Sequence, residues 1–495
     1  MSIKSTQLVV GMEIHVELAT ESKMFTSAPN AANPEHYEAE PNTLCNPLVI
    51  ALPGSLPVIN KRAVVMSMRV GLALNCNIAN FTKWDRKNYF YPDLPKGYQI
   101  SQYDKPLCFD GVLEIETDDG LKPVRITRAH LEEDTGKLGH ELPGGEHYGG
   151  SLVDFNRAGT PLLEIVSEPD MHTADEAVAY GQAVRDICRY LGVSEGIMQR
   201  GHMRFEPNIN VVITTEDGEE FKTPIVEVKN LNSFRALHGA IEFESKRQVE
   251  AWLEDGKVMG PGAKSTRGWD DQKLETVLQR EKEDAHDYRY FPDPDLVPLT
   301  ISNEWIEEVN KTIPELPLSR RMRYQKEFEI SLKDASAIIA EPDFCMFFES
   351  CTHGSDQGSA IAKFLLNTAS KHANDNNTAV AELGITPEQV QGIIQLRASN
   401  EIGSSAADKL FGLLCTSDQT AKAVADVEGL LQVNDESAIS EWVNSAIEAQ
   451  PQAADDVRNG KDAAIGRIIG EVMKRSGGSA DAGAVRGLII KTLRG

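Results

Sequence analysis

Residues Val10 to Leu18 alternate strictly between apolar and polar side chains, and this pattern limits what the chain can fold into. Val10, Met12, Ile14, Val16 and Leu18 fall on one face of the extended segment, and Gly11, Glu13, His15 and Glu17 fall on the other. A period of two is typical of a half-buried strand, which packs one face on a core and leaves the other open. We therefore expect a sheet with one buried face.

Further segments support the same fold class. The alternation recurs from Met203 to Val211, and shorter strand candidates are Arg125 to Glu133, Leu162 to Val166 and Ile225 to Lys229. Asn232 or Ser233 is placed to cap a long helix that ends at about Leu253. Strands of this type, mixed with a few helices, favour an antiparallel sheet in an α+β domain.

The C-terminal part has a different pattern. Residues 296–404 change to helical periodicity, and residues 405–495 are Ala-rich and helical. Thr386, Pro387 and Glu388 mark the start of a helix, with a cap, a proline and an acid in order. A chain of 495 residues is expected to hold about three domains. We place them at 1–295 (catalytic), 296–404 (helical) and 405–495 (tail).

The net charge of the chain limits how it could bind a nucleic acid. The net charge is −25, whereas a protein that binds nucleic acid over its whole surface is usually basic. The stretch from Arg458 to Arg494 is different, because it contains eight Lys or Arg and only three acids, which gives a local charge of +5. Such a stretch is either a local nucleic-acid contact or a solvated helical face.

Cysteine usage and hydropathy indicate a cytoplasmic protein without membrane contact. The seven cysteines are scattered and form no CxxC pair, which is typical of reduced thiols. Polar residues interrupt the first apolar run, so no signal peptide is expected. No stretch of about 18 apolar residues predicts a membrane helix.

Acidic residues and a histidine lie on the strand candidates. Glu13 and His15 share a face, and Glu164 lies in an otherwise apolar run, where an ionised carboxylate needs a partner or a metal. Carboxylates with one histidine approach the oxygen-rich ligand set of Mg²⁺, which positions a nucleoside triphosphate for phosphoryl transfer. Alternation allows only one of the adjacent Glu132 and Glu133 to face such a site. The alternative is that each acid lies on a solvated face.

Residues 85–102 are dense in potential binding groups. Two prolines, one glycine and four aromatic residues predict an ordered loop rather than a regular element. Arg86, Lys87 and Lys96 offer charge to phosphates, and the rings offer stacking surfaces. A well-packed structural loop is the alternative, and residues 280–295 have a similar composition.

The sequence contains no P-loop, no GxGxxG in a βαβ context and no plausible Cys–His nucleophile pair. If ammonia must come from glutamine, another polypeptide has to release it.

Eight motifs together resemble one family. They are GMEIH (11–15), LPGSLP (52–57), DRKNYFYPDLPKGYQISQ (85–102), HLEEDTGK (130–137), DFNRAGTPLLEIVSEPD (154–170), EVKNLNSF (227–234), TRGW (266–269) and DYRYFPDPDL (287–296). In this order they are similar to the B-subunit family of the glutamyl/aspartyl-tRNA amidotransferases, the GatB family. The similarity covers about residues 8–300, and the helical part matches more loosely.

The resemblance implies a glutamine-synthetase-like antiparallel cradle domain, an all-α helical domain and an all-α tail domain that holds tRNA. It implies a heterotrimer in which an amidase A subunit releases ammonia from glutamine and channels it to this chain, together with a small C subunit. It also implies ATP and Mg²⁺ as cofactors. The side-chain carboxylate of misacylated Glu-tRNA(Gln) or Asp-tRNA(Asn) would be phosphorylated, and ammonia would displace the phosphate.

The motif match also implies residue roles. Catalysis and Mg²⁺ binding fall to Glu13, His15, Glu132, Glu133 and Glu164. Phosphate or acyl-phosphate contacts fall to Arg86, Lys87, Arg204 and Lys229. Glu206 or Glu227 would line the ammonia route, and tRNA would contact Lys461, Arg467, Lys474 and Arg475.

The chain departs from the family pattern in two places. Many members carry a four-cysteine zinc site after the first strand, but only Cys45 remains here, which is too few for a structural zinc. We therefore expect no zinc, and packing or hydrogen bonds must hold this segment. Glu206 stands where an Asp is usual, so its role stays open. The chain lacks the inserted domain of the archaeal relative, which favours the three-subunit type.

The residues by themselves leave two other functions open. One is a self-contained ATP-dependent carboxylate–amine ligase that acts on a free small molecule, against which the basic tail counts. The other is a non-catalytic tRNA-binding scaffold, in which Glu13 and Glu164 would tolerate substitution by Ala.

Overall fold

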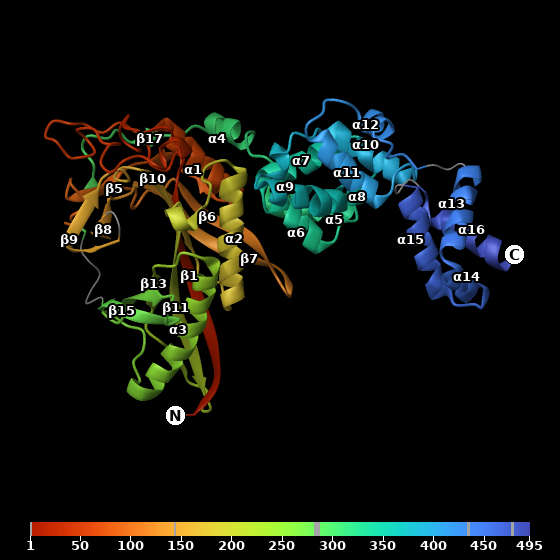
Figure 1. Ribbon diagram of the computed structural model, residues 1–495. Helices are drawn as coiled ribbons and strands as arrows, with labels where there is room; N and C mark the ends of the chain where they lie inside the picture. Colours follow the sequence, from red (N-terminus) through yellow and green to blue (C-terminus); the bar gives the residue numbers. More distant parts are fainter. Residues whose placement is uncertain (1, 143–144, 282–287, 433–435, 477–479) are drawn as a thin grey trace. The chain divides into compact units, whose positions relative to one another are not determined.

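The computed structural model describes residues 2–142, 145–281, 288–432, 436–476 and 480–495 (Figure 1). The chain forms two compact units, Met1–Pro317 and Leu318–Gly495. The first combines strands with helices, and the described residues of the second are helical apart from turns and connections. The protein is therefore mixed α/β, with a large sheet and a helical C-terminal region. The three domain boundaries expected from the sequence stay predictions.

One large sheet organises the first unit and has 13 strands among the described residues. Its main path runs β15-β14-β13-β11-β1-β10-β7-β5-β4-β16, while β6 pairs with β7 and β2, and β12 pairs with β11. The strands are β1 (Ile3–Glu17), β2 (Asn77–Ile78), β4 (Asp85–Asn88), β5 (Tyr98–Ser101), β6 (Cys108–Thr117), β7 (Gly120–Glu133), β10 (Pro161–Ser167), β11 (Met203–Thr215), β12 (Glu220–Lys222), β13 (Val226–Lys229), β14 (Ser265–Asp270), β15 (Glu275–Glu281) and β16 (Phe291–Pro292). Two small ribbons pair β3 (Phe81–Thr82) with β17 (Leu299–Thr300) and β8 (Lys137–Glu141) with β9 (His147–Asp154).

Strand β1 lies inside the sheet, between β10 and β11. Its five alternating apolar side chains from Val10 to Leu18 are each at most 1% exposed, so the half-buried strand predicted from the alternation is confirmed. The strands predicted near residues 125–133, 162–166, 203–211 and 225–229 are confirmed as β7, β10, β11 and β13.

Three helices cover the apolar face: α1 (Lys61–Ala73), α2 (Ala174–Tyr190) and α3 (Phe234–Asp255). Figure 1 shows α2 and α3 lying along the sheet. Ser233 caps α3 by accepting a hydrogen bond from the backbone N–H of Ala236, as predicted. Gly71 allows α1 to pack closely on β6, because a Cβ at this position would lie 2.4 Å from Cys108 Sγ.

The sheet is mixed rather than purely antiparallel, which corrects the expectation from the sequence. Strands β13 and β14 pair in parallel, with Val226 opposite Ser265. Helix α3 lies between them in the chain. A crossover of this length returns the chain to the same end of the sheet, which is what parallel pairing requires.

The expectation of a loop over residues 85–102 was wrong at both ends. Strands β4 and β5 pair antiparallel, with Arg86 opposite Ile100. Pro92, Pro95 and Gly97 lie in the connection between them. These residues disfavour regular structure only locally, and the flanking residues extend the sheet beyond β7. Residues 282–287 of the similar second segment lie outside the described residues.

The segment that follows β1 is held by asparagine side chains. Asn30 Nδ2 donates to the carbonyl oxygens of Leu18 and Thr20, at 2.8 and 3.0 Å. Asn156 Oδ1 accepts from the backbone N–H of Leu44 at 2.9 Å. Cys45 packs beside a small apolar cluster that includes Ala28, Val49 and Ala158. Hydrogen bonds and packing therefore order this segment.

The helices from the end of the first unit onward are α4 (Asn303–Asn310), α5 (Pro317–Glu327), α6 (Leu332–Ile339), α7 (Pro342–Thr352), α8 (Gly358–Phe364), α9 (Ser370–Asn376), α10 (Pro387–Ala398), α11 (Ser404–Leu414), α12 (Ala421–Val427), α13 (Glu436–Ala449), α14 (Pro451–Arg458), α15 (Ile465–Arg475) and α16 (Ala482–Arg494). The predicted start at Thr386 is confirmed, because its side chain caps α10. Helices α13 to α16 share one apolar core. Throughout the described part of the chain, every helix is too short or too polar to cross a membrane.

Substituting Gly71→Ala should destabilise the first unit. The new methyl group would overlap Cys108, and overpacking of this kind costs about 1–3 kcal/mol of unfolding free energy. Urea denaturation followed by tryptophan fluorescence measures this, because Trp84, Trp252, Trp269 and Trp305 lie in this unit. Gly149→Ala on β9 is the control, since nothing lies within 4 Å of its added Cβ. Equal stability of the two variants would contradict the close approach of Gly71 to Cys108.

Candidate active site

The face of the sheet opposite the three helices carries a row of charged side chains. The strand register places His15 opposite Glu164 on one side and Arg204 on the other, and Glu164 opposite His130. Directly opposed residues of antiparallel strands project from the same face. Four neighbouring strands therefore contribute one polar row.

Two groups of possible metal ligands share His15. The ligand atoms of Glu13, His15 and Glu206 all lie within 4.8 Å of one another, and so do those of His15, Glu132 and Glu164. His15 Nε2 is 3.3 Å from Glu13 Oε1 and 3.9 Å from Glu206 Oε1. Carboxylates from β1, β7, β10 and β11 thus surround one imidazole, and we call these five residues the acidic cluster.

Glu13 and His15 stabilise each other's charge. Burial opposes the charge on both groups. For Glu13, the hydrogen bond with His15 and the charge of His15 together outweigh burial and lower the pKa to about 2. For His15, the hydrogen bond with Glu13 and the charges of Glu206 and Glu164 together outweigh burial and raise the pKa to about 9. Without a bound cation, the pair is therefore a carboxylate and an imidazolium at neutral pH.

Two further acids of the cluster, Glu132 and Glu164, have too little positive charge beside them. Burial raises the pKa of Glu132, and burial together with the charge of Glu13 raises the pKa of Glu164. Within the described residues, the buried Glu132 Oε2 and His15 Nδ1 have no hydrogen-bond partner. A divalent cation would supply the missing positive charge, and the carboxylate oxygens, which outnumber the one imidazole, are the donors that Mg²⁺ prefers.

Lys87 faces the acidic cluster, whereas its neighbour Arg86 does not. Burial would lower the pKa of Lys87, but the charges of Glu132 and Glu164 are among the causes that raise it, so the ammonium group persists. Arg86 projects to the reverse side, where its Nε lies 2.7 Å from Asp293 Oδ2.

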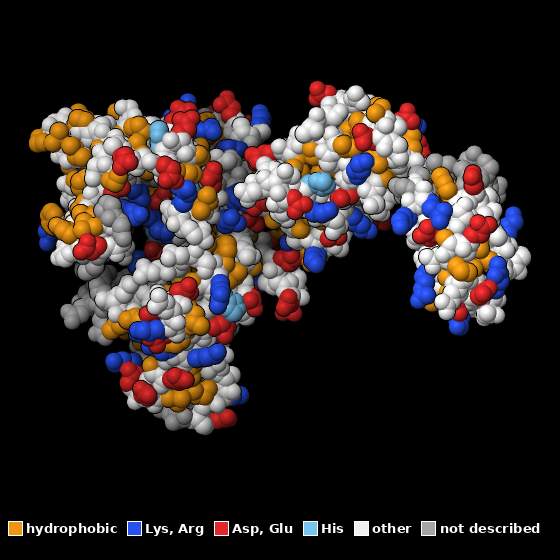
Figure 2. Space-filling model, in the orientation of Figure 1, with side chains coloured by type: hydrophobic (Ala, Val, Ile, Leu, Met, Phe, Trp, Pro, Cys, Tyr) orange, Lys and Arg blue, Asp and Glu red, His pale blue; other side chains and the backbone are white. Residues whose placement is uncertain are grey.

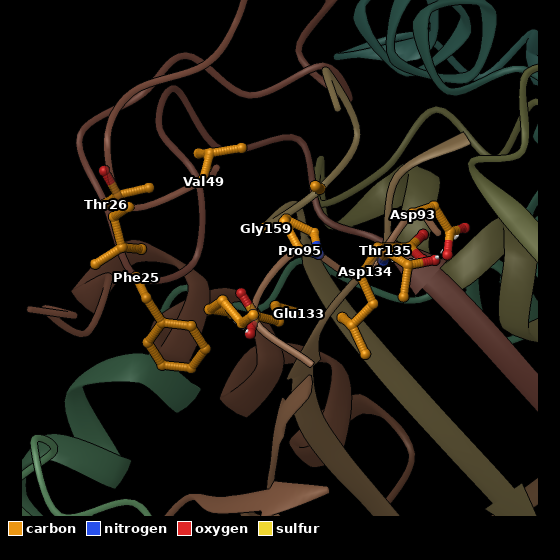
Figure 3. Close-up of a pocket in the computed structure, with 13 residues that line it drawn as sticks. Phe25, Thr26, Val49, Asp93, Pro95, Glu133, Asp134, Thr135 and Gly159 are labelled. Atoms are coloured by element: carbon orange, nitrogen blue, oxygen red, sulfur yellow. Dashed lines mark hydrogen bonds and ion pairs between the residues drawn. The ribbon is translucent and has the colours of Figure 1, made fainter. Parts of the chain in front are cut away.

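Glu133 also lies on the reverse side of the sheet. It forms an ion pair with Lys96 and accepts a hydrogen bond from the backbone N–H of Ile100 at 3.0 Å. Figure 3 shows the carboxylate beside a small cavity that Phe25 and Val49 also line. Of the adjacent acids, Glu132 therefore faces the acidic cluster and Glu133 does not.

Two cations flank the acidic cluster in fixed ion pairs. Arg204 Nη2 lies 2.7 Å from Asp134 Oδ2. Lys229 Nζ lies 2.5 Å from Glu206 Oε2 and 2.9 Å from Glu227 Oε1. Both positive charges are thus held in position before any substrate binds.

The sequence motifs did not assign roles to His130, Glu17 and Asp134, which border the same site. His130 Nε2 lies 3.6 Å from Glu164 Oε2. Burial and the charge of Asp134 raise the pKa of Glu17 to about 8, so this carboxyl group keeps a proton at neutral pH. Alternation is the sequence signal that groups His130 and Asp134 with Glu132, and Glu17 with Glu13 and His15, on the polar face.

Comparison with known proteins identifies the family of this chain. Residues 8–307 match the model of the GatB/GatE catalytic domain, and residues 346–493 match that of the GatB domain. The chain belongs to the GatB/GatE family. The resemblance drawn from the sequence motifs is thereby confirmed.

Three relatives of this GatB-family chain share one name, which describes each as the B subunit of an aspartyl/glutamyl-tRNA(Asn/Gln) amidotransferase. The protein of Thermoanaerobacter pseudethanolicus is 42% identical over 96% of both chains. Those of Geotalea uraniireducens and Bacillus velezensis are 41% and 42% identical, over 99% of both chains.

The fold brings together most of the site residues predicted for this GatB-family chain. Those on or beside the polar face are Glu13, His15, Lys87, Glu132, Glu164, Arg204, Glu206 and Lys229. Glu133 and Arg86 lie on the reverse side. The roles assigned to all of them stay predictions.

The four residues predicted to contact tRNA lie in the second unit, near the C-terminus. Figure 2 shows Lys and Arg side chains interspersed with acidic ones on the surface of this unit. Arg467 and Lys474 are exposed and seven residues apart on α15, so they share one side of the helix. Lys461 and Arg475 are engaged in ion pairs with Asp456 and Glu471. A nucleic-acid backbone would meet Arg467 and Lys474 more easily than the other two.

Removing the imidazole of His15 should flatten the pH dependence of stability. The folded pKa of about 9 exceeds the ordinary 6.5, so the stabilisation is complete below pH 6.5 and is lost as the pH rises to 9. In EDTA, the unfolding free energy of the parent should fall by roughly 1–3 kcal/mol over this window, and that of His15→Asn should fall much less. His140→Asn, at an exposed residue of β8, is the control. A parallel fall in all three proteins would rule out the Glu13–His15 pair as its cause.

Proposed function

We propose that this chain amidates misacylated Glu-tRNA(Gln), Asp-tRNA(Asn) or both, as the catalytic B subunit of a heterotrimer with an amidase A subunit and a small C subunit. One observation carries this proposal: the acidic cluster of Glu13, His15, Glu132, Glu164 and Glu206 lies on the polar face of a sheet within the GatB/GatE catalytic domain. The shared name of the relatives denotes one subunit of an enzyme, which supports a role within a complex.

The reaction needs activation of a carboxylate, which is a poor acylating group. Phosphorylation by ATP converts it into an acyl phosphate, from which ammonia displaces phosphate. Mg²⁺, when bound by the acidic cluster, would offset the charge of the triphosphate. Lys87 supplies a further positive charge on the same face. Lys229, which forms ion pairs with Glu206 and Glu227, would contact the acyl phosphate.

Ammonia would arrive from the A subunit, because the sequence holds no plausible glutaminase nucleophile pair. Glu206 and Glu227 provide polar groups at one side of the acidic cluster, together with Lys229 and Lys264. We assign the last part of the ammonia route to this side. An ammonium ion would be held there by the carboxylates of Glu206 and Glu227, one of which would accept its proton and release ammonia for the attack.

The domain assignment belongs to the same proposal. A glutamine-synthetase-like cradle domain over residues 1–295 would hold ATP and the acylated tRNA end. A helical domain over 296–404 would follow, and the tail domain over 405–495 would bind tRNA through its basic residues. A cytoplasmic location fits this substrate, because aminoacyl-tRNA is made and used there.

Removing a charge from the acidic cluster should abolish phosphoryl transfer. In the chain co-purified with its partner subunits, Glu13→Gln and Glu164→Gln should each lower ADP release by roughly 100-fold or more, as loss of transition-state electrostatics does. The assay supplies ATP, Mg²⁺, ammonium and misacylated Glu-tRNA(Gln), and compares it with the same tRNA deacylated. Glu114→Gln, at an exposed residue of β6, is the matched control and should be as active as the parent.

The same assay separates the other functions. Equal ADP release with deacylated tRNA would indicate a ligase for a free small molecule. Parental activity of both cluster variants would indicate a non-catalytic scaffold.

The basic tail can be tested by its effect on salt dependence. The double substitution Arg467→Ala/Lys474→Ala removes two candidate phosphate contacts, so the slope of log Kd for tRNA against log salt should fall by about 1 to 2. Filter binding over a range of salt concentrations measures this slope. Lys409→Ala, at a residue of α11 paired with Glu428, is the control. An unchanged slope in the double variant would place the tRNA surface elsewhere.

A further inference from the structure

Aromatic rings gather beside the acidic cluster, and the proposed reaction does not use them. The rings of Tyr103 and Tyr290 are stacked, with centroids 4.1 Å apart and planes 8° from parallel. Tyr288 meets Tyr290 edge-on at 6.0 Å, and Tyr89 meets Tyr288 in the same manner. Four tyrosines from two distant segments of the chain thus form one group.

The register explains why these rings border the acidic cluster. Phe291 lies opposite Arg86, so the preceding residue, Tyr290, projects to the same side as Lys87. Burial raises the pKa of Tyr290 to about 12, and the charges of Lys87, Glu132 and Glu164 also act on it. Lys87 Nζ lies 5.2 Å from the ring centroid of Tyr288. Lys87 therefore lies between the rings and the carboxylates.

Tyr103 is open to solvent despite its stacked partner. Tyr290 covers one face of its ring, yet 59% of the side chain remains exposed. An exposed ring that is fixed by a second ring can stack another flat group without first losing conformational freedom. Purine bases are flat groups of this kind, and stacking on an aromatic side chain is favourable for any base.

We propose that the Tyr103–Tyr290 pair is a stacking platform for an adenine ring, with Lys87 and the acidic cluster on its phosphate side. The inference rests on the proposed function, because two substrates of that reaction carry adenine: ATP and the 3′-terminal adenosine of the tRNA. Both place a phosphate or ester group a few bonds from the base. The order of groups along the sheet, from rings through Lys87 to carboxylates, matches the order of groups along either adenosine.

Equilibrium binding tests the platform without requiring turnover. The full chain, co-purified with its partner subunits in Mg²⁺, would be titrated with ATP, with tripolyphosphate, and with tRNA that has or lacks its 3′-terminal adenosine. Tyr103→Ala removes the ring, and Tyr103→Phe keeps it. Tyr148→Ala, at a similarly exposed tyrosine on β9, is the control.

If the platform holds the base of ATP, Tyr103→Ala should weaken ATP binding by roughly 5- to 150-fold and leave tripolyphosphate binding unchanged. If it holds the terminal adenosine, ATP binding should stay the same, while the variant no longer distinguishes tRNA with this nucleotide from tRNA without it. In either case Tyr103→Phe should bind like the parent.

Three results would overturn the platform: Tyr103→Ala binding every ligand as Tyr148→Ala does, an equal loss for ATP and tripolyphosphate, or a parent that binds neither ATP nor the terminal adenosine. Failure of the proposed function is a separate result, because it appears as ADP release that does not depend on charged tRNA. Binding can support the platform even where that activity assay fails.

Discussion

One face of strand β1 must be buried and the other needs partners for its charges. The rest of the first unit depends on how the neighbouring elements provide both. Its apolar face is covered by helices α1 to α3, and burial of such side chains is the main favourable term in folding. Its polar face carries Glu13, His15 and Glu17, which are at every second position along the strand. Charges this close to a core are tolerated only when paired, so the adjacent strands must supply partners. The register with β10 and β11 does so.

Some carboxylates on this face lack a paired positive charge, and this is what allows the face to bind a cation. Glu13 and His15 satisfy each other, whereas Glu132 and Glu164 share too little positive charge. Buried carboxylates without enough positive charge are costly, and an apolar layer over this side would supply none. This face is therefore suited to binding a cation. Lys87 and Lys229 lie on either side of the carboxylates, which places positive charge where anionic groups would enter.

Local patterns predicted individual elements well, because their causes lie within a few residues. Alternation placed β1 and β11, a serine cap placed the start of α3, and a threonine followed by proline placed the start of α10. Pairing between distant segments escaped prediction. The parallel contact of β13 with β14 depends on where α3 returns the chain. The hairpin of β4 and β5 pairs with the edge of β7. Because the connection between its strands contains two prolines and a glycine, the sequence predicted a loop over the whole segment.

The sequence by itself determined which residue types the site contains and which residues of one strand share a face, since a period of two requires no knowledge of neighbours. It separates Glu132 from Glu133 and groups Glu13 with His15. Only the tertiary structure decided that Glu132, Glu164 and Glu206 converge on His15, because three separate pairings set that geometry. It also placed Lys87 toward the acidic cluster and Arg86 against Asp293. The stacking of Tyr103 on Tyr290 joins segments nearly 190 residues apart, and no local pattern carries that information.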